Sequence, residues 1–185
     1  TSQAQTAPEK TNGARVVTTE FYTGFGWNWR TLQDEDPSVS FWLETSLNRV
    51  YPASLPGDKQ TLKLLTPRNA HLSFQACLRN DRTWPIDIEC SVSGADDLKI
   101  RVRRVGFVPQ FNYTGDTPKK ELDGWGHVPG LVPDPLYPES KALVGPFVTQ
   151  PFWISVQVPA NAKTGVRELS VKFTSATLKE PVVLK

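Results

Sequence analysis

The sequence predicts an all-β protein, an antiparallel, jelly-roll-like β-sandwich with a long loop rich in proline and aromatic residues. Several runs alternate apolar with polar side chains, as strands with one buried face do. The sixteen prolines and the absence of heptad-like spacing indicate that helix is a minor component. At 185 residues, the chain suits one domain with a substantial core.

The N-terminal residues 1–14 are polar, small and unpatterned, and we expect them to be a flexible lead-in. A single sandwich domain is expected over residues 15–185. If the segment after residue 15 is extended, Phe25, Trp27 and Trp29 share one face. That face is either part of the core or an exposed platform.

Two alternating runs in the middle of the chain, residues 72–79 and 86–92, predict a hairpin because turn-forming residues separate them. Residues 98–107 also alternate, and this run predicts a further strand. Its apolar parity shifts by one residue at Arg103 and Arg104, which predicts a β-bulge at that point.

Residues 109–149 are predicted to form one long loop, which its proline and aromatic content keeps ordered. A second hairpin is expected after it, from strands at 152–158 and 169–173 with a turn at Gly165. Trp153 alternates with the core-facing positions of its strand. It should therefore lie on the outer face of the sandwich, where a covering element or a partner domain would explain it.

The two cysteines, Cys77 and Cys90, permit one disulfide. Directly opposite residues of a hairpin share a face, but Cys77 falls on the polar face of its strand and Cys90 on the apolar face of the next. A bridge between hairpin neighbours is therefore disfavoured, although a bulge or a non-neighbour pairing would restore it. The cysteines therefore do not decide whether the protein is in an oxidising or a reducing compartment, and neither does the single glycosylation sequon at Asn112.

Composition argues against several classes of function. The 21 basic and 19 acidic residues leave a formal charge of +2, too small and too dispersed for a nucleic-acid partner. No apolar run approaches the roughly 18 residues that span a bilayer, so no membrane partner is expected. With only two histidines in the sequence, no metal site, triad or cofactor is expected. Asp123 and Asp134 are interpreted as turn formers rather than as a catalytic pair.

Aromatic residues are therefore the better candidates for binding. The predicted binding residues are Trp125, His127, Asp134 and Tyr137 in the long loop, together with Trp153. Sugar faces stack on tryptophan and tyrosine rings, and a proline-stiffened loop presents such rings at a low ordering cost. The same rings are typical of the end of a sandwich or of a domain interface, and both interpretations stay open. For His127, bracing of its own turn is the alternative to binding a ligand.

Some motifs between residues 40 and 175 are specific enough to compare with a known family. The segments are 50–52, 72–76, 100–108, 133–138 with its Asp-Pro-Leu-x-Pro loop, and above all 150–165 with its Trp-x-x-Val-x-Val-Pro strand and Ala-x-x-Gly turn. They resemble the N-terminal β-sandwich domain of family-123-type glycoside hydrolases and their uncharacterised relatives. After Gly165 the chain departs from that pattern, with Val166 to Leu169 where an aromatic residue and a second glycine are expected.

In that family the sandwich precedes a catalytic (β/α)8 barrel, which cleaves N-acetyl-β-galactosaminides by substrate-assisted catalysis with an Asp-Glu pair in the barrel. The resemblance implies a non-catalytic accessory module of a carbohydrate-active protein, which ends where the barrel would begin, packs against it and contacts glycan. No catalytic residue carries over, and we expect a secreted, periplasmic or cell-surface location. The alternative is a structural or protein-interaction module without sugar binding; a self-contained enzyme using Asp123 or Asp134 is the third possibility.

Overall fold

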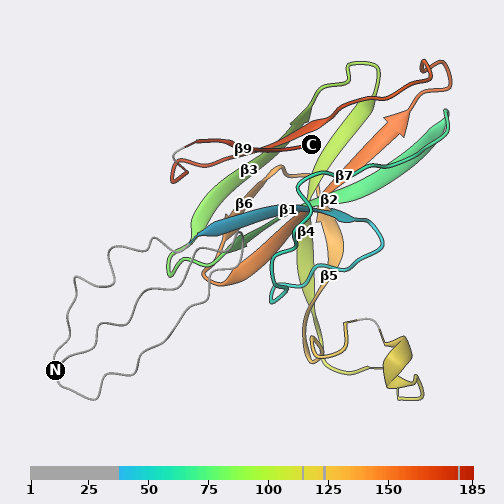
Figure 1. Cartoon of the computed structure of the whole chain (residues 1–185). Coiled ribbons are helices and arrows are strands. Elements are labelled where there is room, and N and C mark those ends of the chain that lie inside the picture. Colours follow the sequence, from blue (N-terminus) through green and yellow to red (C-terminus); the bar gives the residue numbers. More distant parts are fainter. Residues whose placement is uncertain (1–37, 114, 123, 179) are drawn as a thin grey trace, which may run out of the picture. The chain divides into compact units, whose positions relative to one another are not determined.

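The computed structural model describes residues 38–113, 115–122, 124–178 and 180–185, and Figure 1 labels their elements. Two antiparallel sheets pack on one another, which confirms the predicted all-β sandwich. Within the described residues the single helical element is η1 (Lys119–Glu121), one turn of 3₁₀ helix. None of the helical structure in these ranges is long and apolar enough to cross a membrane.

The strands of the described residues are divided between a five-stranded and a four-stranded sheet. The five-stranded sheet has the order β1 (Val39–Thr45), β2 (Ala70–Asn80), β7 (Val148–Val158), β4 (Lys99–Gln110) and β5 (Gly130–Tyr137). The four-stranded sheet has the order β6 (Lys141–Val144), β3 (Ile86–Ser93), β8 (Ser170–Thr174) and β9 (Val182–Leu184). The predicted lead-in at 1–14, and the aromatic run from Phe25 to Trp29, lie outside the described residues.

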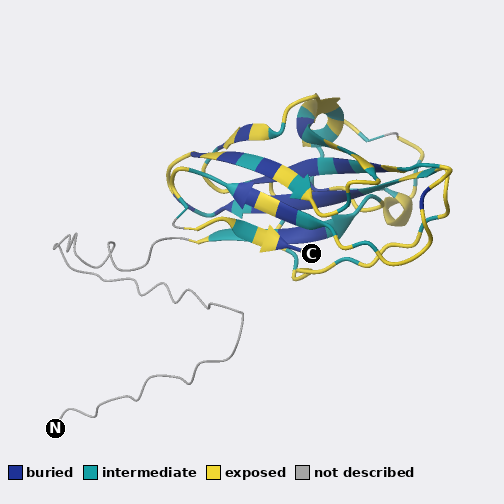
Figure 2. Ribbon diagram, turned by 90° about the horizontal axis from the view of Figure 1, so that it is seen from above, coloured by how far each residue is buried: buried dark blue, intermediate teal, exposed yellow. Residues whose placement is uncertain are grey.

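The core lies between the two sheets and is built by the inward-facing members of the alternating runs. Phe152 and Ile154 of β7 and Ile88 of β3 are at most 1% exposed. The rings of Phe152 and Phe173 meet edge-on across the sheets, with centroids 6.2 Å apart. Burying one such side chain contributes about 1.5–3 kcal/mol, so this layer supplies most of the driving force for folding. In Figure 2 the buried residues concentrate in the strands and the exposed ones in the connections.

Both predicted hairpins are wrong, because each connects strands of different sheets. β2 pairs with β1 and β7, whereas β3 pairs with β6 and β8. β7 and β8 are likewise in different sheets. Alternation of apolar and polar residues identifies a strand and its buried face. It does not identify the strand that pairs with it, because strands in two facing sheets bury alternate side chains just as two paired strands of one sheet do.

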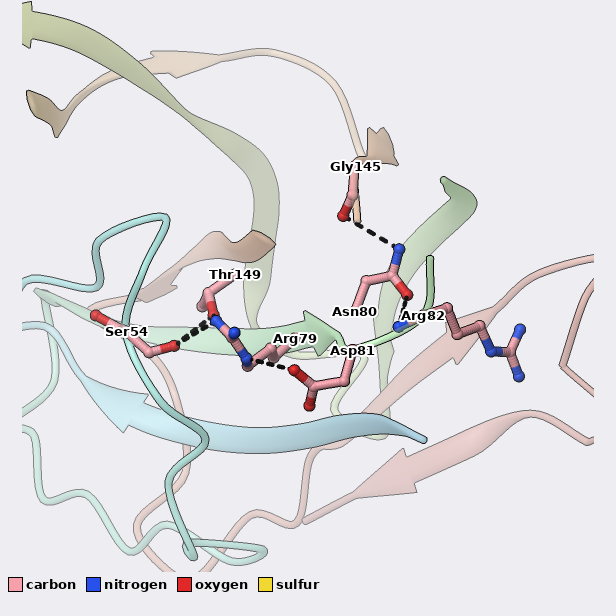
Figure 3. A network of polar contacts seen from close by, with 7 residues as sticks. All are labelled: Ser54, Arg79, Asn80, Asp81, Arg82, Gly145 and Thr149. Atoms are coloured by element: carbon pink, nitrogen blue, oxygen red, sulfur yellow. Dashed lines mark hydrogen bonds and ion pairs between the residues drawn. The ribbon is translucent and has the colours of Figure 1, made fainter. Parts of the chain in front are cut away.

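Asn80, the last residue of β2, fixes the point where the chain leaves one sheet for the other (Figure 3). Its side chain is fully buried, and Nδ2 donates to the carbonyls of Trp84, Val144 and Gly145 at 2.9–3.1 Å. Its Oδ1 accepts from the Arg82 backbone N–H at 3.1 Å. One side chain thus satisfies polar groups on two connections between the sheets, which an apolar residue could not do.

The predicted long loop at 109–149 is also wrong, because β5 and β6 lie within it and only residues 111–129 connect β4 to β5. Pro133 and Pro135 indicated loop in the sequence, but β5 is an edge strand, where proline is tolerated. A β-bulge is present in this strand pair, as the parity shift predicted. It lies between Val105 and Phe107, beyond the predicted position at Arg103–Arg104.

Beyond Arg104, β4 no longer pairs with β7 but continues to pair with β5 as far as Gln110. We call this two-stranded extension, with the connection at 111–129 that closes it, the arm; its η1 loop projects from the sandwich in Figure 1. The ring of Tyr137 lies over the backbone at Gly106, where any side chain would collide with it.

Both cysteines are free and buried. Cys90 faces the core between the sheets, whereas Cys77 lies on the other face of β2 beside Trp42 and Val50. They belong to different sheets, so the reason given against a bridge, that they sit on hairpin neighbours, does not apply. Burial raises the pKa of the Cys90 thiol to about 12, and burial raises that of Cys77 well above its ordinary value.

Candidate functional site

The outer face of the five-stranded sheet brings Trp153 next to polar side chains from three other strands. The register places Trp153 of β7 directly opposite Gln75 of β2 on one side and Arg103 of β4 on the other. Gln75 is in turn opposite Glu44 of β1. Directly opposite residues project from the same face, so these four residues form one row across the sheet.

A second row lies one step along the same face. It contains Ser73, Ser155 and Arg101, which are opposite one another on β2, β7 and β4. The hydroxyl of Ser155 links the two rows, because it accepts from Arg103 Nη1 at 3.4 Å and from Ser73 Oγ at 3.4 Å. A third row of His71, Gln157 and Lys99 continues toward the end of the sheet, and all three are exposed.

We call the first two rows, without Glu44, the Trp153 face: Ser73, Gln75, Arg101, Arg103, Trp153 and Ser155. Gln75 is held rigidly, because its Nε2 donates to the carbonyls of Thr45 and Asn48 at 2.8 and 2.7 Å. The indole of Trp153 is half-buried between its neighbours. An aromatic surface beside hydroxyl and guanidinium groups suits a polar ligand that also has an apolar face.

The next row toward the other end of the sheet is covered by the chain itself. It consists of Trp42, Cys77 and Pro151, which are all buried. Residues 46–58, which we call the covering segment, lie over it and contribute Val50 to a small apolar cluster with Trp42 and Cys77. The outer face therefore changes at the Trp153 row, where Gln75 is still buried but Trp153 and Arg103 are partly exposed.

Hydrogen bonds hold the covering segment in place (Figure 3). Thr149 donates from its backbone N–H to the Pro52 carbonyl at 2.8 Å and from its hydroxyl to the Ser54 carbonyl at 2.6 Å. Arg79 donates to the same Ser54 carbonyl at 3.3 Å and pairs with Asp81 at 2.7 Å. The covering segment, which borders the Trp153 face, is thus held in a fixed position.

The arm contains Trp125 and His127, and it packs onto the covering segment. The His127 ring stacks on that of Tyr51, with centroids 4.1 Å apart and planes 3° from parallel. The Tyr113 hydroxyl donates to the Gly124 carbonyl at 2.7 Å, and Gly124 has a φ of +72° with the Tyr51 hydroxyl in the space of a Cβ. The His127 ring therefore braces the turn, while its use in ligand binding remains a prediction.

Trp125 is 54% exposed at the tip of the arm. Its ring stacks on Tyr113 at 5.4 Å, and Lys119 Nζ lies 4.8 Å from its centroid. Three apolar side chains near the end of the β4–β5 pair are also exposed: Val108, Phe111 and Leu131 at 37, 74 and 47%. The arm tip thus combines a braced backbone with several exposed apolar groups.

Asp134 and Tyr137 are both in β5, and both are exposed. Arg104 covers the Tyr137 ring, with Cζ 4.6 Å from the ring centroid, and pairs with Glu139 at 2.9 Å. Across the described residues, no hydrogen bond, ion pair or ring contact connects the β5 pair, the arm-tip pair and Trp153 to one another. The predicted binding residues therefore occupy three separate places.

Sequence reasoning identified Trp153 but missed the residues beside it. The pattern predicts that the side chains beside it face outward, because each alternates with apolar positions in its own strand: Ser73, Gln75, Arg101 and Arg103. The sequence does not predict that they are adjacent to Trp153, because that depends on the register between strands far apart in the chain. No group of three metal-ligating side chains is found in the part of the chain that the structure describes.

No protein-family model and no curated protein matches this sequence. Among solved structures, the chain is similar to a family 123 glycoside hydrolase from Clostridium perfringens, studied for its hydrolysis of glycolipid glycans, with a TM-score of 0.58 and 13% identity. The match covers 80% of this chain and 26% of that enzyme. At this identity the similarity shows a shared fold, and the chain spans about a quarter of the enzyme's length.

Proposed function

We propose that this chain is a non-catalytic accessory β-sandwich module of a carbohydrate-active, glycoside hydrolase-like protein, which packs against a catalytic barrel and contacts glycan. The observation that carries the proposal is the structural match, which takes in four-fifths of this chain but only a quarter of a glycoside hydrolase. That proportion fits one module of a larger enzyme.

The arm is the surface we assign to the barrel. Phe111, Trp125 and Leu131 are exposed there, and apolar groups gathered at one end of a module are typical of domain interfaces. The stack of His127 on Tyr51 keeps the arm tip in one conformation, so docking costs little ordering entropy. We assign the exposed Asp134 and Tyr137 of β5, which lie apart from the arm tip, to the same docking interface.

The Trp153 face is the surface we assign to glycan. Its indole provides a stacking platform, and the hydroxyls of Ser73 and Ser155 can exchange hydrogen bonds with sugar hydroxyls. All six residues of the face project from three neighbouring strands of one sheet, so their positions are fixed before binding. With a glycan ligand, we propose a secreted, periplasmic or cell-surface location for the protein.

Two measurements test the proposal. The gene should encode a (β/α)8 barrel in the same polypeptide, and the purified chain should bind sugars on a glycan array, with binding lost in Trp153→Ala. Retention of the native circular dichroism spectrum by the variant is the control. The absence of both the barrel and any glycan binding would refute the proposal.

A protein-interaction module without sugar binding is the second candidate, and the exposed apolar residues of the arm favour it. In the full-length protein, Phe111→Ser combined with Leu131→Ser should make the junction to the barrel more susceptible to limited proteolysis. Leu143→Ser, at a residue 73% exposed on β6, is the matched control. If the arm instead serves a separate protein, the double variant leaves the proteolysis pattern unchanged.

A further inference from the structure

The three strand positions 99, 101 and 103 of β4 carry a line of cations along one edge of the Trp153 face. Lys99, Arg101 and Arg103 are opposite Gln157, Ser155 and Trp153 of β7. Alternate residues of a strand are about 6.7 Å apart on one face, so the three charges extend over about 13 Å. They follow the line of β7, on which the indole is located.

None of these three cations has a carboxylate partner among the described residues. Five other basic side chains of the described sandwich are paired, at 2.7–3.6 Å: Lys59 with Glu44, Arg79 with Asp81, Arg104 with Glu139, Lys141 with Glu89 and Arg167 with Asp97. Arg103 Nη1 donates to the Ser155 hydroxyl at 3.4 Å, and the Arg101 side chain is exposed. Both guanidinium groups can therefore bind an incoming anion.

The position of β5 leaves this line accessible from the side. β5 pairs with β4 only from Arg104 onward, so residues 99–103 have β7 on one flank and, among the described residues, no strand on the other. The covering segment closes the opposite end of the face at the row of Trp42, Cys77 and Pro151. An extended ligand on this face would therefore lie along β4 and β7 and pass over Trp153.

We propose that the Trp153 face binds acidic oligosaccharides, with Arg101 and Arg103 holding carboxylate or sulfate groups while Trp153 stacks on a sugar ring. The inference rests on the glycan contact of the proposed function and specifies its ligand class. Guanidinium groups form paired, charge-assisted hydrogen bonds to planar carboxylates, and they also bind sulfate. Ser73, Ser155 and Gln157 provide neutral partners for the hydroxyls between the charged groups.

The alternation of charge with aromatic surface distinguishes this ligand class from a nucleic acid or an acidic protein. The formal charge of the whole chain is only +2, without the broad positive field that nucleic-acid binding uses. An acidic peptide would match the cations but would leave the hydroxyls of Ser73 and Ser155 and the flat indole without sugar hydroxyls or a ring face to contact. An acidic oligosaccharide matches all three kinds of group.

Calorimetric titration of the whole chain tests the proposal with two pairs of probes. One pair is a galacturonate tetramer and its methyl ester, and the other is a sulfated galactose tetramer and its desulfated counterpart. The acidic member of at least one pair should bind about tenfold more tightly than its neutral counterpart, since charged hydrogen bonds are the stronger ones. The pair that shows the difference identifies the anionic group.

Variants of the face locate the binding. Arg101→Gln with Arg103→Gln should remove the preference for the acidic probe, whereas Lys63→Gln with Lys172→Gln, an equal loss of charge at exposed residues elsewhere, should leave it intact. Trp153→Phe should weaken binding of the acidic probe while retaining the preference. An equal effect of the two double variants would overturn the proposal, because it would indicate non-specific attraction.

The failures of the two proposals are distinguishable. Equal binding of acidic and neutral probes that is lost in Trp153→Phe refutes the acidic preference and leaves the glycan contact intact. Absence of binding to every probe refutes the acidic preference and counts equally against the glycan contact. Binding of hexaglutamate as tight as that of the acidic sugar, with the same dependence on Arg101 and Arg103, would assign the face to an acidic protein and overturn the inference.

Discussion

Two tryptophans lie on the same outer face of the five-stranded sheet, one cross-strand row apart, in different surroundings. Trp42 is 2% exposed and is closed off by Val50 and Gly57 of the covering segment. Trp153 is half-buried and has Gln75 and Arg103 as its neighbours. The face is thus a second small core where a segment covers it, and a candidate binding surface where the described residues leave it open.

The largest expected effect separates these two tryptophans by stability. Trp42→Ala should lower the free energy of unfolding by about 3–5 kcal/mol, because it leaves a cavity in a closed cluster. Trp153→Ala should lower it by less than half as much, since part of its indole is already in water. Urea unfolding followed by circular dichroism measures both, and an equal loss in the two variants would contradict the comparison.

Gly57→Ala should have a smaller effect, again confined to the covered part. A Cβ on Gly57 would lie 2.6 Å from Cδ1 of Trp42, so the ring or the segment must shift. Overpacking of this kind costs about 1–3 kcal/mol of unfolding free energy. Gly115→Ala is the control, because a Cβ there meets nothing within 4 Å. A stability loss that is the same for both variants would show that the segment does not press on Trp42.

The cysteines test how tightly the covered part is sealed. Burial raises the pKa of both thiols, so the folded state keeps them protonated after the unfolded state has begun to ionise. The stability they contribute is full below the unfolded pKa of about 9 and is lost as pH rises toward the folded value, about 12 for Cys90. Between pH 9 and 11, unfolding free energy should therefore fall less steeply in Cys77→Ala and in Cys90→Ala than in the parent chain.

Thiol labelling at pH 8 makes the same comparison directly. Cys77 lies beneath the covering segment, and Cys90 lies between the sheets; both are 0% exposed. A thiol reagent should modify neither in the folded chain and both in urea. Much faster modification of Cys77 would show that the covering segment opens independently of the sandwich.

The sequence was sufficient for the local features of this fold and insufficient for its long-range ones. Alternation located β2, β3 and β7 and predicted that Trp153 faces outward, because Phe152 and Ile154 on either side of it are core residues. It could not predict that β2 and β3 belong to different sheets, since that depends on the contacts of Asn80 with chain more than 60 residues away.

The candidate site was predicted in part for the same reason. Trp153 was found from its own strand, whereas Arg103 became its neighbour only through the register of β4 on β7. Pro133 and Pro135 concealed β5, because a missing N–H argues against a central strand but not against an edge. His127 was placed correctly in a turn, but its stacking partner Tyr51 lies in a segment that no local pattern connects with it.

The smallest expected effect concerns the ion pair beside the covering segment. Lys59 Nζ donates to Glu44 Oε1 at 2.7 Å, at the end of the Trp153 row. Burial alone would raise the pKa of Glu44, but the hydrogen bonds from Lys59 and from the Thr45 backbone N–H together lower it below its ordinary value. The pair therefore adds stability above the unfolded pKa of about 4.5, and this is lost as pH falls through the lower folded value.

Lys59→Gln should consequently reduce unfolding free energy slightly at pH 7, by less than Gly57→Ala does, because solvent and salt screen a surface pair. The difference between variant and parent should shrink below pH 4 and in 1 M salt. Lys172→Gln, at an exposed residue of β8, is the control for the loss of one charge. A larger effect than that of Gly57→Ala would mean that this ion pair, rather than packing on Trp42, keeps the segment closed.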